Sequence, residues 1–434
     1  MFVYLKNLVL TTMLFLMYLL NYIMLSKLEK WMYLANVFDY NYSLFAIVIA
    51  YVTSVPFIAY IISTNRKKVF SALVTLLLLV GVLPGVIVYS LSSLESKYIF
   101  VILYVYILFI LNFFSIKSVY IKKETMQYES KININLFLYF GYFGIAFYSY
   151  LLIKYFNIIN LRSISDVYIQ RSIFFSVVSG WEIYCITFAK YISAFSLLTV
   201  AIYKRKSVYL LPIIFVYSVD YLLAAHKTSI VLMLFAVFYY FYNKKINIQN
   251  FYINNIVFIV LLFTITLQYM MYTENILLDT VIGLYDRIFF VTSSLFARFY
   301  EFANLNYFFY GGSGLIGKLF SSISINDSYT LVVGSTYFSE NVRANADFIS
   351  DGYINFGIIG SLVEIIFLWL FFNKRDNKIY REQIVLLFPL TFVYSIVLFS
   401  MGLQTSLLTG GMIFYIIIIK FGFSYRKNKL KKGI

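Results

Sequence analysis

The stretch VFSALVTLLLLVGVLPGVIVYSLSSL (residues 69–94) decides the fold class of this chain, because it contains no charged side chain. It follows directly on three basic residues, Arg66, Lys67 and Lys68. A helix of about 20 apolar residues is long enough to cross the hydrocarbon core of a bilayer. The stretch therefore predicts a transmembrane helix with a positively charged flank at one end.

Apolar runs of this kind recur along the whole chain, in which 62% of the residues are hydrophobic and only 12% are charged. Runs of this length fit helices, whose backbone polar groups are satisfied internally in lipid. We therefore expect an all-α polytopic membrane protein of about twelve transmembrane helices, and a soluble fold is excluded. The expected spans are residues 2–25, 41–63, 69–94, 98–116, 135–154, 182–203, 207–224, 228–243, 251–271, 353–372, 383–403 and 406–424.

Clusters of lysine and arginine follow every second span along the chain. This alternation is the pattern of the positive-inside rule, by which such loops stay in the cytoplasm. The net charge of +16 therefore orients the protein in the membrane, and nucleic-acid binding would need a soluble basic surface that is absent here. We expect both termini in the cytoplasm, with the first apolar segment retained as a helix and not cleaved as a signal peptide.

Several classes of site are excluded by composition. The single cysteine, Cys185, rules out a disulfide framework, and the single histidine, His226, leaves no histidine-based metal site. No phosphate-binding P-loop and no dinucleotide fingerprint occurs in the sequence. We therefore expect no metal, no cofactor and no nucleotide-driven energy coupling.

The predicted topology gives one transmembrane domain, residues 1–434, with two long outward segments. These are residues 155–181 and the larger periplasmic loop 272–352. An ordered connection as long as the second is usually functional. Polar chemistry is therefore expected on the outward face.

Within the larger loop, residues 279–310 predict an amphipathic helix at or in the membrane surface. At 100° per residue Arg287, Ser294, Arg298 and Glu301 lie on one face. Arginine binds phosphate oxygens in a bidentate manner, so this face predicts phosphate recognition. The alternative is a solvated face on which Arg298 pairs with Glu301.

The segment NVRANADFISDGYINFGIIG (residues 341–360) concentrates polar groups immediately before an apolar run. If it is helical, Arg343, Asp347 and Asp351 share one stripe, and Arg343 forms a salt bridge with Asp347. The functional alternative is that Arg343 binds an anionic head group while Asp347 accepts a proton or positions a sugar hydroxyl. Asn345 belongs to the same polar segment.

Further polar residues fall inside or at the ends of expected spans. Charged side chains inside a membrane usually contact other charged or polar groups. We therefore expect Lys190 and Asp220 to form a pair, either structural or functional, and Glu364 to have a partner of its own. In AAHKTSI (residues 224–230), Lys227 is a candidate phosphate contact, and His226 is either a general base or a capping residue. Arg162, Asp166 and Arg171 give the shorter loop phosphate-binding potential.

This organisation resembles the Wzy-type polymerases, which join the repeat units of O-antigen and other surface polysaccharides. The resemblance rests on about twelve spans, a long outward loop near two-thirds of the chain, and ANADFISDGYINFGIIG (residues 344–360) leading into the next span. Weaker matches lie at residues 226–230 and 287–301. The resemblance implies a metal-independent glycosyltransferase with a GT-C-like architecture in the bacterial inner membrane.

The same resemblance implies the substrates and the roles of individual residues. The growing glycan would pass from undecaprenyl diphosphate to the next lipid-linked repeat unit, with membrane lipids and a polysaccharide chain-length regulator among the partners. The diphosphate-binding residues that the resemblance implies are Lys227, Arg287 or Arg298, and Arg343, and the catalytic candidates are Asp347, Glu340 and Asp351. From their own positions in the sequence we add Arg171 as a diphosphate contact and Asn345, His226 and Arg162 as substrate-binding residues.

Two alternatives stay open. The related O-antigen ligases carry a histidine in the segment that corresponds to NVRANADF (residues 341–348), and this chain has none there. That difference disfavours the ligase and leaves the general base undecided among Asp347, Glu340 and Asp351. A lipid-linked oligosaccharide flippase or other transporter would put charged groups near the membrane midplane and show two similar halves, and no internal repeat is evident.

Overall fold

A computed structural model describes residues 2–27, 40–64, 69–94, 97–117, 128–159, 167–242, 251–271, 282–283, 285–306, 308–310, 328–338, 343–373, 381–408 and 410–427. Within these ranges the protein is helical, apart from one short pair of strands. Eight of the described helices are long and apolar enough to cross a membrane, and four shorter apolar helices accompany them. Helices occur within each of the twelve ranges expected from the sequence, so the prediction of a polytopic helical membrane protein is confirmed.

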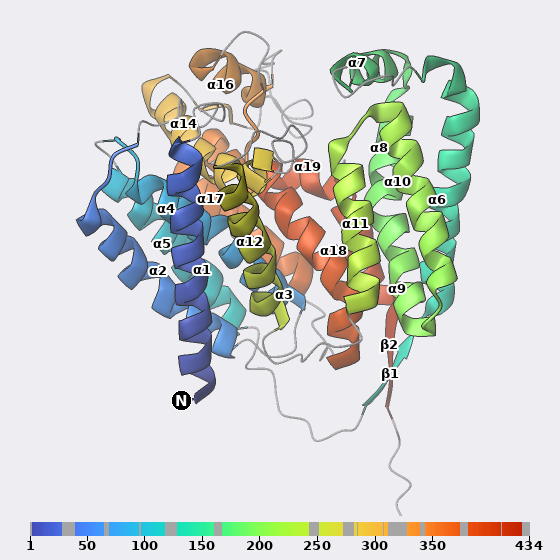
Figure 1. The fold of residues 1–434 in the computed structure, drawn as a ribbon, viewed down its shortest axis with the longest axis horizontal. Helices are drawn as coiled ribbons and strands as arrows, with labels where there is room; N and C mark the ends of the chain where they lie inside the picture. The colour runs from blue at the N-terminus through green and yellow to red at the C-terminus, as the bar shows by residue number, and fades with distance from the viewer. Residues whose placement is uncertain are drawn as a thin grey trace, which may run out of the picture. The chain divides into compact units, whose positions relative to one another are not determined.

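The helices form two compact units, each assembled from separate parts of the chain (Figure 1). Unit 1 comprises residues 1–120, 249–377 and 395–403, and unit 2 comprises residues 121–248, 378–394 and 404–434. The elements of unit 1 are α1 (Phe2–Lys27), α2 (Leu44–Thr64), α3 (Val69–Leu77), η2 (Leu78–Val82), α4 (Leu83–Ser90), α5 (Lys97–Lys117), α12 (Phe251–Met270), η9 (Arg287–Val291), α14 (Thr292–Leu305), α16 (Tyr329–Tyr337), α17 (Phe348–Asn373) and the end of α18 (Arg381–Ser400).

Unit 2 is a second helical bundle. Its elements are β1 (Tyr128–Ile132), α6 (Ile134–Tyr155), η3 (Phe156–Ile158), α7 (Val167–Val177), α8 (Gly180–Phe188), η5 (Ala189–Ser193), α9 (Ala194–Lys204), η6 (Ser207–Tyr209), α10 (Leu210–Ala224), α11 (Lys227–Tyr242), the first part of α18, most of α19 (Leu403–Leu408), α20 (Met412–Phe421) and β2 (Phe423–Lys427).

The apolar stretch at residues 69–94 lies at the centre of unit 1. Its helical window from Ala72 to Ser90 is fully buried, because other helices of the unit surround it. The helix is interrupted by the π-helical turn η2, where Gly81 packs against the ring of Phe399 and its carbonyl accepts a hydrogen bond from Ser293 Oγ at 3.0 Å. An uninterrupted apolar sequence therefore marks a helix buried on all sides.

Helix α14 lies within residues 279–310, where an amphipathic helix at or in the membrane surface was expected. It packs against α4, α16 and α17, and both its serines and its phenylalanines are buried. The hydroxyls of Tyr89 and Tyr104 donate to the carbonyl of Ser293 at 2.7 and 2.9 Å. Buried tyrosines therefore satisfy the backbone at the start of α14, while its position relative to the membrane surface stays a prediction.

Aromatic contacts define the two ends of unit 1. At one end Phe100 contacts Tyr300 with ring centroids 5.2 Å apart, and Asn21 Nδ2 donates to Tyr285 Oη at 2.7 Å. At the other end Phe114 contacts Trp369 at 5.1 Å. The helices α14 and α16 of the long loop therefore lie at the end that holds the C-terminus of α1 (Figure 1). Which membrane face this end meets stays a prediction.

A short antiparallel ladder closes one end of unit 2. Strand β1 pairs with β2 in the register Tyr128 opposite Lys427, and Asn133 N donates to Gly422 O at 2.8 Å. The opposite end carries α7 and the turn between α10 and α11 (Figure 1). Lys131 of β1 and Arg426 and Lys427 of β2 therefore lie in the same ladder.

The polar start of α8 explains one buried charge in unit 2. Glu182 accepts from the backbone and the hydroxyl of Ser179 at 2.9 and 2.7 Å, which forms a capping box. Its carboxylate also contacts Lys154 Nζ at 2.8 Å and the hydroxyls of Tyr150 and Tyr155. Both carboxylate oxygens of Glu182 accept hydrogen bonds from neighbouring donors. This cluster therefore stabilises the start of α8.

Helix α17 folds back on itself within the polar-to-apolar segment of residues 341–360. The backbone leaves helical geometry at Phe356 and at Gly357, which has φ 64° and ψ −151°. Ser361 Oγ donates to Ile349 O at 2.8 Å across twelve residues, a pair that would lie about 18 Å apart in a straight helix. The expected single span at residues 353–372 is therefore divided: residues 348–355 form the first arm of a helical hairpin and residues 358–373 form the second.

Candidate functional site

The first arm of the α17 hairpin begins at Asp347, which caps it. Asp347 Oδ1 accepts a hydrogen bond of 2.5 Å from the backbone nitrogen of Ser350, three residues on. The side chain is only 1% exposed, and its Oδ2 has no hydrogen-bond partner among the described residues. Residues 343–347 are extended, so the predicted helical stripe of Arg343, Asp347 and Asp351 does not form.

Burial raises the pKa of Asp347 to about 6, while hydrogen bonds from Ser350 and Ile349 oppose this rise and the Asp351 charge adds to it. Because the folded pKa exceeds the unfolded value, the folded state binds more protons, and stability is lost as pH rises from about 4 through 6. The effect on unfolding free energy is at most about 3 kcal/mol.

We expect Asp347→Asn, which keeps the cap, to flatten the dependence of the thermal unfolding midpoint on pH between 4.5 and 7.

Asp351, one turn further along the hairpin, lies against a second acid. Its carboxyl interacts with that of Glu364 on the other arm, with the hydroxyl of Tyr329 and with Asn355 Nδ2 at 3.2 Å. Asp351 Oδ2 also rests directly on the α-carbon of Gly402, where no side chain would fit. Glu364 thus faces a second acid across the hairpin and not an opposite charge, and its Oε2 has no hydrogen-bond partner among the described residues.

The arginines expected to bind diphosphate have different surroundings. Arg298 Nη1 lies 2.8 Å from Glu301 Oε2, and its guanidinium lies over the Tyr337 ring at 4.9 Å. The predicted Arg298–Glu301 pair is therefore present, and Arg298 remains 21% exposed. Arg343 is exposed, and no ion pair joins it to Asp347 in the described part of the chain.

Helix α16 connects these residues. Its C-terminal Tyr337 lies under Arg298, and near its start the carbonyl of Thr330 accepts from the backbone nitrogen of Ala344 at 2.9 Å, one residue after Arg343. Arg287 is exposed in the π-helical turn η9. Such a turn disrupts the spacing of 100° per residue, so the predicted common face of Arg287, Ser294 and Arg298 is not kept, and Ser294 is buried.

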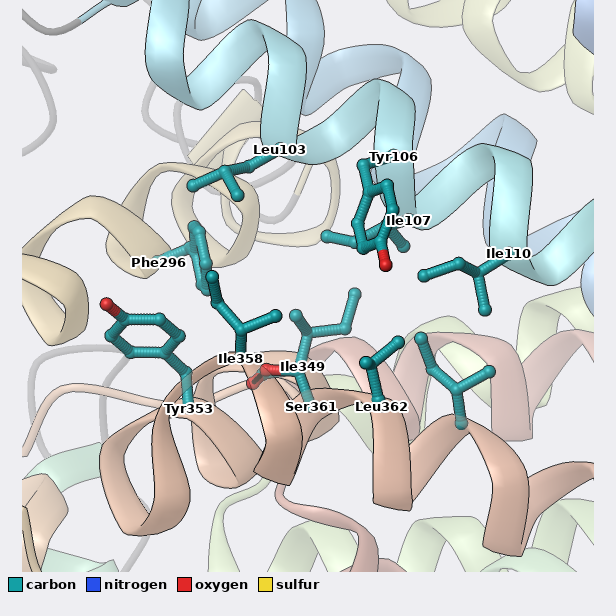
Figure 2. A pocket seen from close by; sticks show the side chains of 11 residues that line it. Leu103, Tyr106, Ile107, Ile110, Phe296, Ile349, Tyr353, Ile358, Ser361 and Leu362 are labelled. Atoms are coloured by element: carbon teal, nitrogen blue, oxygen red, sulfur yellow. Dashed lines mark hydrogen bonds between the residues drawn. The ribbon is translucent and has the colours of Figure 1, made fainter.

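A small apolar groove, with an internal volume of only about 20 Å³, lies beside the hairpin between α5 and α17. Figure 2 shows Leu103, Tyr106 and Ile107 of α5 facing Ile358 and Leu362 of α17. At one end of the groove Tyr353 stacks on Tyr300 at 5.1 Å, and its hydroxyl accepts from Asn304 Nδ2 at 3.3 Å. The groove is therefore apolar along its length and meets polar groups of α14 at one end.

A separate polar cluster in unit 2 is centred on Asp220, which is 1% exposed near the end of α10. Asp220 Oδ2 lies 3.2 Å from Lys190 Nζ and 3.1 Å from His226 Nδ1, and it also accepts from the hydroxyl of Ser229. Its Oδ1 accepts from Tyr148 Oη at 2.7 Å. The predicted Lys190–Asp220 pair is present, and the contribution of His226 to it was missed by sequence reasoning.

Helix α7 braces the turn that carries His226. Arg171 Nη2 donates to Ala225 O at 2.9 Å, and Gln170 Nε2 donates to Leu223 O at 3.0 Å. Ala225 has φ 50°, a left-handed conformation that is uncommon for a residue with a side chain. Arg171 therefore serves at least this structural role, beside the phosphate contact predicted for it.

Three predicted site residues are not placed. Arg162 and Glu340 lie outside the described residues, and Lys227 is described only as the first residue of α11, without its side chain. Asn345 is half-buried in the extended segment before α17. Asp347, Asp351, Arg298 and Arg343 are thus grouped in unit 1, while His226 and Arg171 are grouped in unit 2.

Comparison with known proteins gives no relative: no family model, no curated protein and no solved structure matches this chain. The chain is a polytopic helical membrane protein, and any finer assignment depends on its own residues.

Proposed function

We propose that this protein is a bacterial inner-membrane polymerase of surface-polysaccharide repeat units, such as those of O-antigen or capsule. It would transfer the growing glycan from undecaprenyl diphosphate to the next lipid-linked repeat unit on the periplasmic side, as a metal-independent glycosyltransferase of GT-C-like architecture. The sequence resemblance suggested this activity.

The observation that carries the proposal is the convergence of α14, α16 and the start of α17 at one end of unit 1. Arg298 lies over Tyr337 at the end of α16, and Ala344, the residue after Arg343, bonds to Thr330 near the start of α16. Guanidinium groups suit the diphosphate of a lipid-linked donor. The neighbouring side chains of α5 and α17 are mostly apolar, a surface compatible with its polyprenyl chain. These features support a lipid diphosphate as the ligand of unit 1.

In the proposed reaction, a hydroxyl oxygen of the acceptor sugar forms a bond to the anomeric carbon of the donor glycan. The bond from that carbon to the diphosphate oxygen breaks, its electron pair stays on the diphosphate, and the hydroxyl proton passes to a base. Arg298 and Arg343 would stabilise the negative charge that develops on the leaving diphosphate. No nucleotide is consumed, because the donor is already activated.

We expect Arg298→Ala and Arg343→Ala each to lower the rate of chain elongation by about 10²–10³-fold, the usual cost of losing one donor to a developing charge. Arg298→Lys and Arg343→Lys should recover only part of the rate, since lysine keeps the charge but not the bidentate geometry. The assay is ladder formation by purified protein from synthetic polyprenyl-diphosphate repeat unit.

The control is Lys206→Ala, which removes one exposed positive charge in unit 2 and should leave the ladder unchanged. Addition of a chelator should also leave the ladder unchanged if the enzyme is metal-independent. Full elongation by both arginine-to-alanine proteins would remove the arginines from the site. No ladder from the wild-type protein, together with polymer accumulating on the carrier in a deletion strain, would favour the ligase. Movement of intact substrate across the bilayer without glycan transfer would favour a transporter.

A further inference from the structure

The buried cluster in unit 2 contains a histidine whose two ring nitrogens have different surroundings. His226 Nδ1 lies 3.1 Å from Asp220 Oδ2, and a carboxylate can only accept a hydrogen bond, so Nδ1 carries the proton. In the neutral ring Nε2 then keeps its lone pair. The orientation of His226 is thus determined by a carboxylate that is itself almost completely buried.

Asp220 is held in place by groups from three other elements. Tyr148 of α6 donates to Oδ1, while Lys190 of η5 and Ser229 of α11 contact Oδ2. Lys190 also donates to Thr228 Oγ1 at 3.0 Å. The carboxylate cannot rotate without breaking several of these contacts, so it fixes the imidazole plane as well as its tautomer.

The buried part of the cluster is an ion pair between Asp220 and Lys190, one negative and one positive charge. Tyr148 and Tyr217 interact with the carboxylate, and Arg171 places a further positive charge beside the turn that carries the imidazole. A proton added to Nε2 would be stabilised by Asp220 through Nδ1–H. This is the arrangement in which a histidine accepts a proton and is held by its carboxylate partner as it does so.

The imidazole is accessible, unlike the carboxylates at the start of α17. The His226 side chain is 23% exposed, with the Phe175 ring centroid 5.7 Å away, whereas Asp347 and Asp351 are almost fully buried. Two local features position the ring: the left-handed Ala225 at the end of α10 and the π-helical turn η5 that carries Lys190. Isolated π-helical turns occur frequently at functional sites.

We propose that His226 and Asp220 form a proton-accepting dyad, in which Nε2 of His226 takes the proton of a substrate hydroxyl and Asp220 is the positioning residue. As the substrate oxygen forms its new bond, the O–H bond breaks, its electron pair stays on oxygen, and the proton forms a bond to Nε2. The imidazolium later returns the proton to water. That the hydroxyl belongs to the acceptor sugar rests on the proposed polymerase function, whereas the dyad itself does not.

The dyad can be tested without substrate, because His226 is the only histidine in the sequence. The protein is labelled with ¹⁵N-histidine, purified by an affinity tag that contains no histidine, and placed in lipid nanodiscs. Its NMR spectrum then contains imidazole signals from one residue. We expect the neutral ring to be the Nδ1–H tautomer, with Nε2 unprotonated and reactive toward diethyl pyrocarbonate. Asp220→Asn should remove the preference for this tautomer. An Nε2–H tautomer, or an unreactive Nε2, would overturn the dyad.

The role of the dyad in transfer is tested with paired variants. Asn at position 226 can donate to Asp220 from near the Nδ1 position but has no atom at Nε2, so His226→Asn should fold and lose about 10²–10⁴-fold in elongation rate. His226→Gln should show a similar loss, because an amide nitrogen has no free lone pair with which to accept the proton. An active His226→Asn protein would overturn the role of Nε2. A wild-type protein that makes no polymer would overturn the proposed function, while the tautomer experiment still decides the dyad.

Discussion

Gly360→Ala is expected to prevent this protein from accumulating in a folded form. A Cβ at position 360 would overlap the carbonyl oxygen of Gly352 on the facing arm of the hairpin, and a Cβ at position 352 would lie 2.6 Å from the Gly360 carbonyl carbon. Both obstacles are backbone atoms, which cannot rotate away as a side chain can. We therefore expect a loss at the upper end of the usual overpacking range or beyond it, about 3 kcal/mol or more.

Fluorescence-detected size-exclusion chromatography of detergent-solubilised protein measures this effect as the height of the monodisperse peak and as the temperature at which half of it is lost. Gly180→Ala is the matched control, because nothing lies within 4 Å of a Cβ at that position. The control should behave as the wild type does. A Gly360→Ala protein with an unchanged midpoint would show that the two arms of α17 do not pack closely.

Asp220→Ala should be the most damaging substitution among the buried charges of unit 2. It leaves Lys190 about 95% buried with Thr228 as its remaining hydrogen-bond partner in the described cluster. Removing one partner of a buried ion pair typically costs about 3–5 kcal/mol, because the other charge is left uncompensated. Lys190→Met should cost less, since Asp220 keeps donors from Tyr148, His226 and Ser229.

The double variant Asp220→Ala with Lys190→Met separates pairing from packing. Because it removes both charges, we expect its thermal midpoint to lie above that of Asp220→Ala alone, with a coupling energy of about 1–3 kcal/mol in the mutant cycle. Equal or additive losses in the three variants would mean that the two charges do not stabilise each other. This outcome would also weaken the positioning role assigned to Asp220.

The membrane class and the helix positions could be predicted because they depend on the length and composition of continuous apolar runs. The run at residues 69–94 gave a helix, although the π-helical turn at Leu78–Val82 was not expected. Such a turn depends on tertiary neighbours such as Phe399 and Ser293, which lie far away in the sequence. Local periodicity carries no information about them.

The chain reversal in α17 is indicated in the sequence by closely spaced glycines, a pattern that hydropathy does not detect. Gly352, Gly357 and Gly360 occur within nine residues, and closely spaced glycines often mark close approach of two backbones. Hydropathy alone predicts a single transmembrane helix for such a segment. The contact between Asp351 and Glu364 follows from the reversal, so it could not be found while residues 353–372 were treated as a straight helix.

The Asp220–His226 contact was also missed, although the Lys190–Asp220 pair was considered. Asp220 and His226 are six residues apart, a spacing that does not share a face in a continuous helix. They meet because Ala225 ends α10 in a left-handed conformation and the chain turns directly into α11. A single alanine conformation thus determines this part of the candidate site.

The interleaved composition of the two units constrains how the protein is made. Each unit contains residues from before position 249 and residues from beyond position 377, and the ladder of unit 2 pairs Tyr128–Ile132 with Phe423–Lys427. Strand β1 therefore has no pairing partner until the ribosome has synthesised β2. During synthesis the early helices lie in the bilayer without the later helices they pack against. An insertase or chaperone would protect their unpaired surfaces in this period. Expression of residues 1–248 alone should accordingly yield neither bundle in finished form.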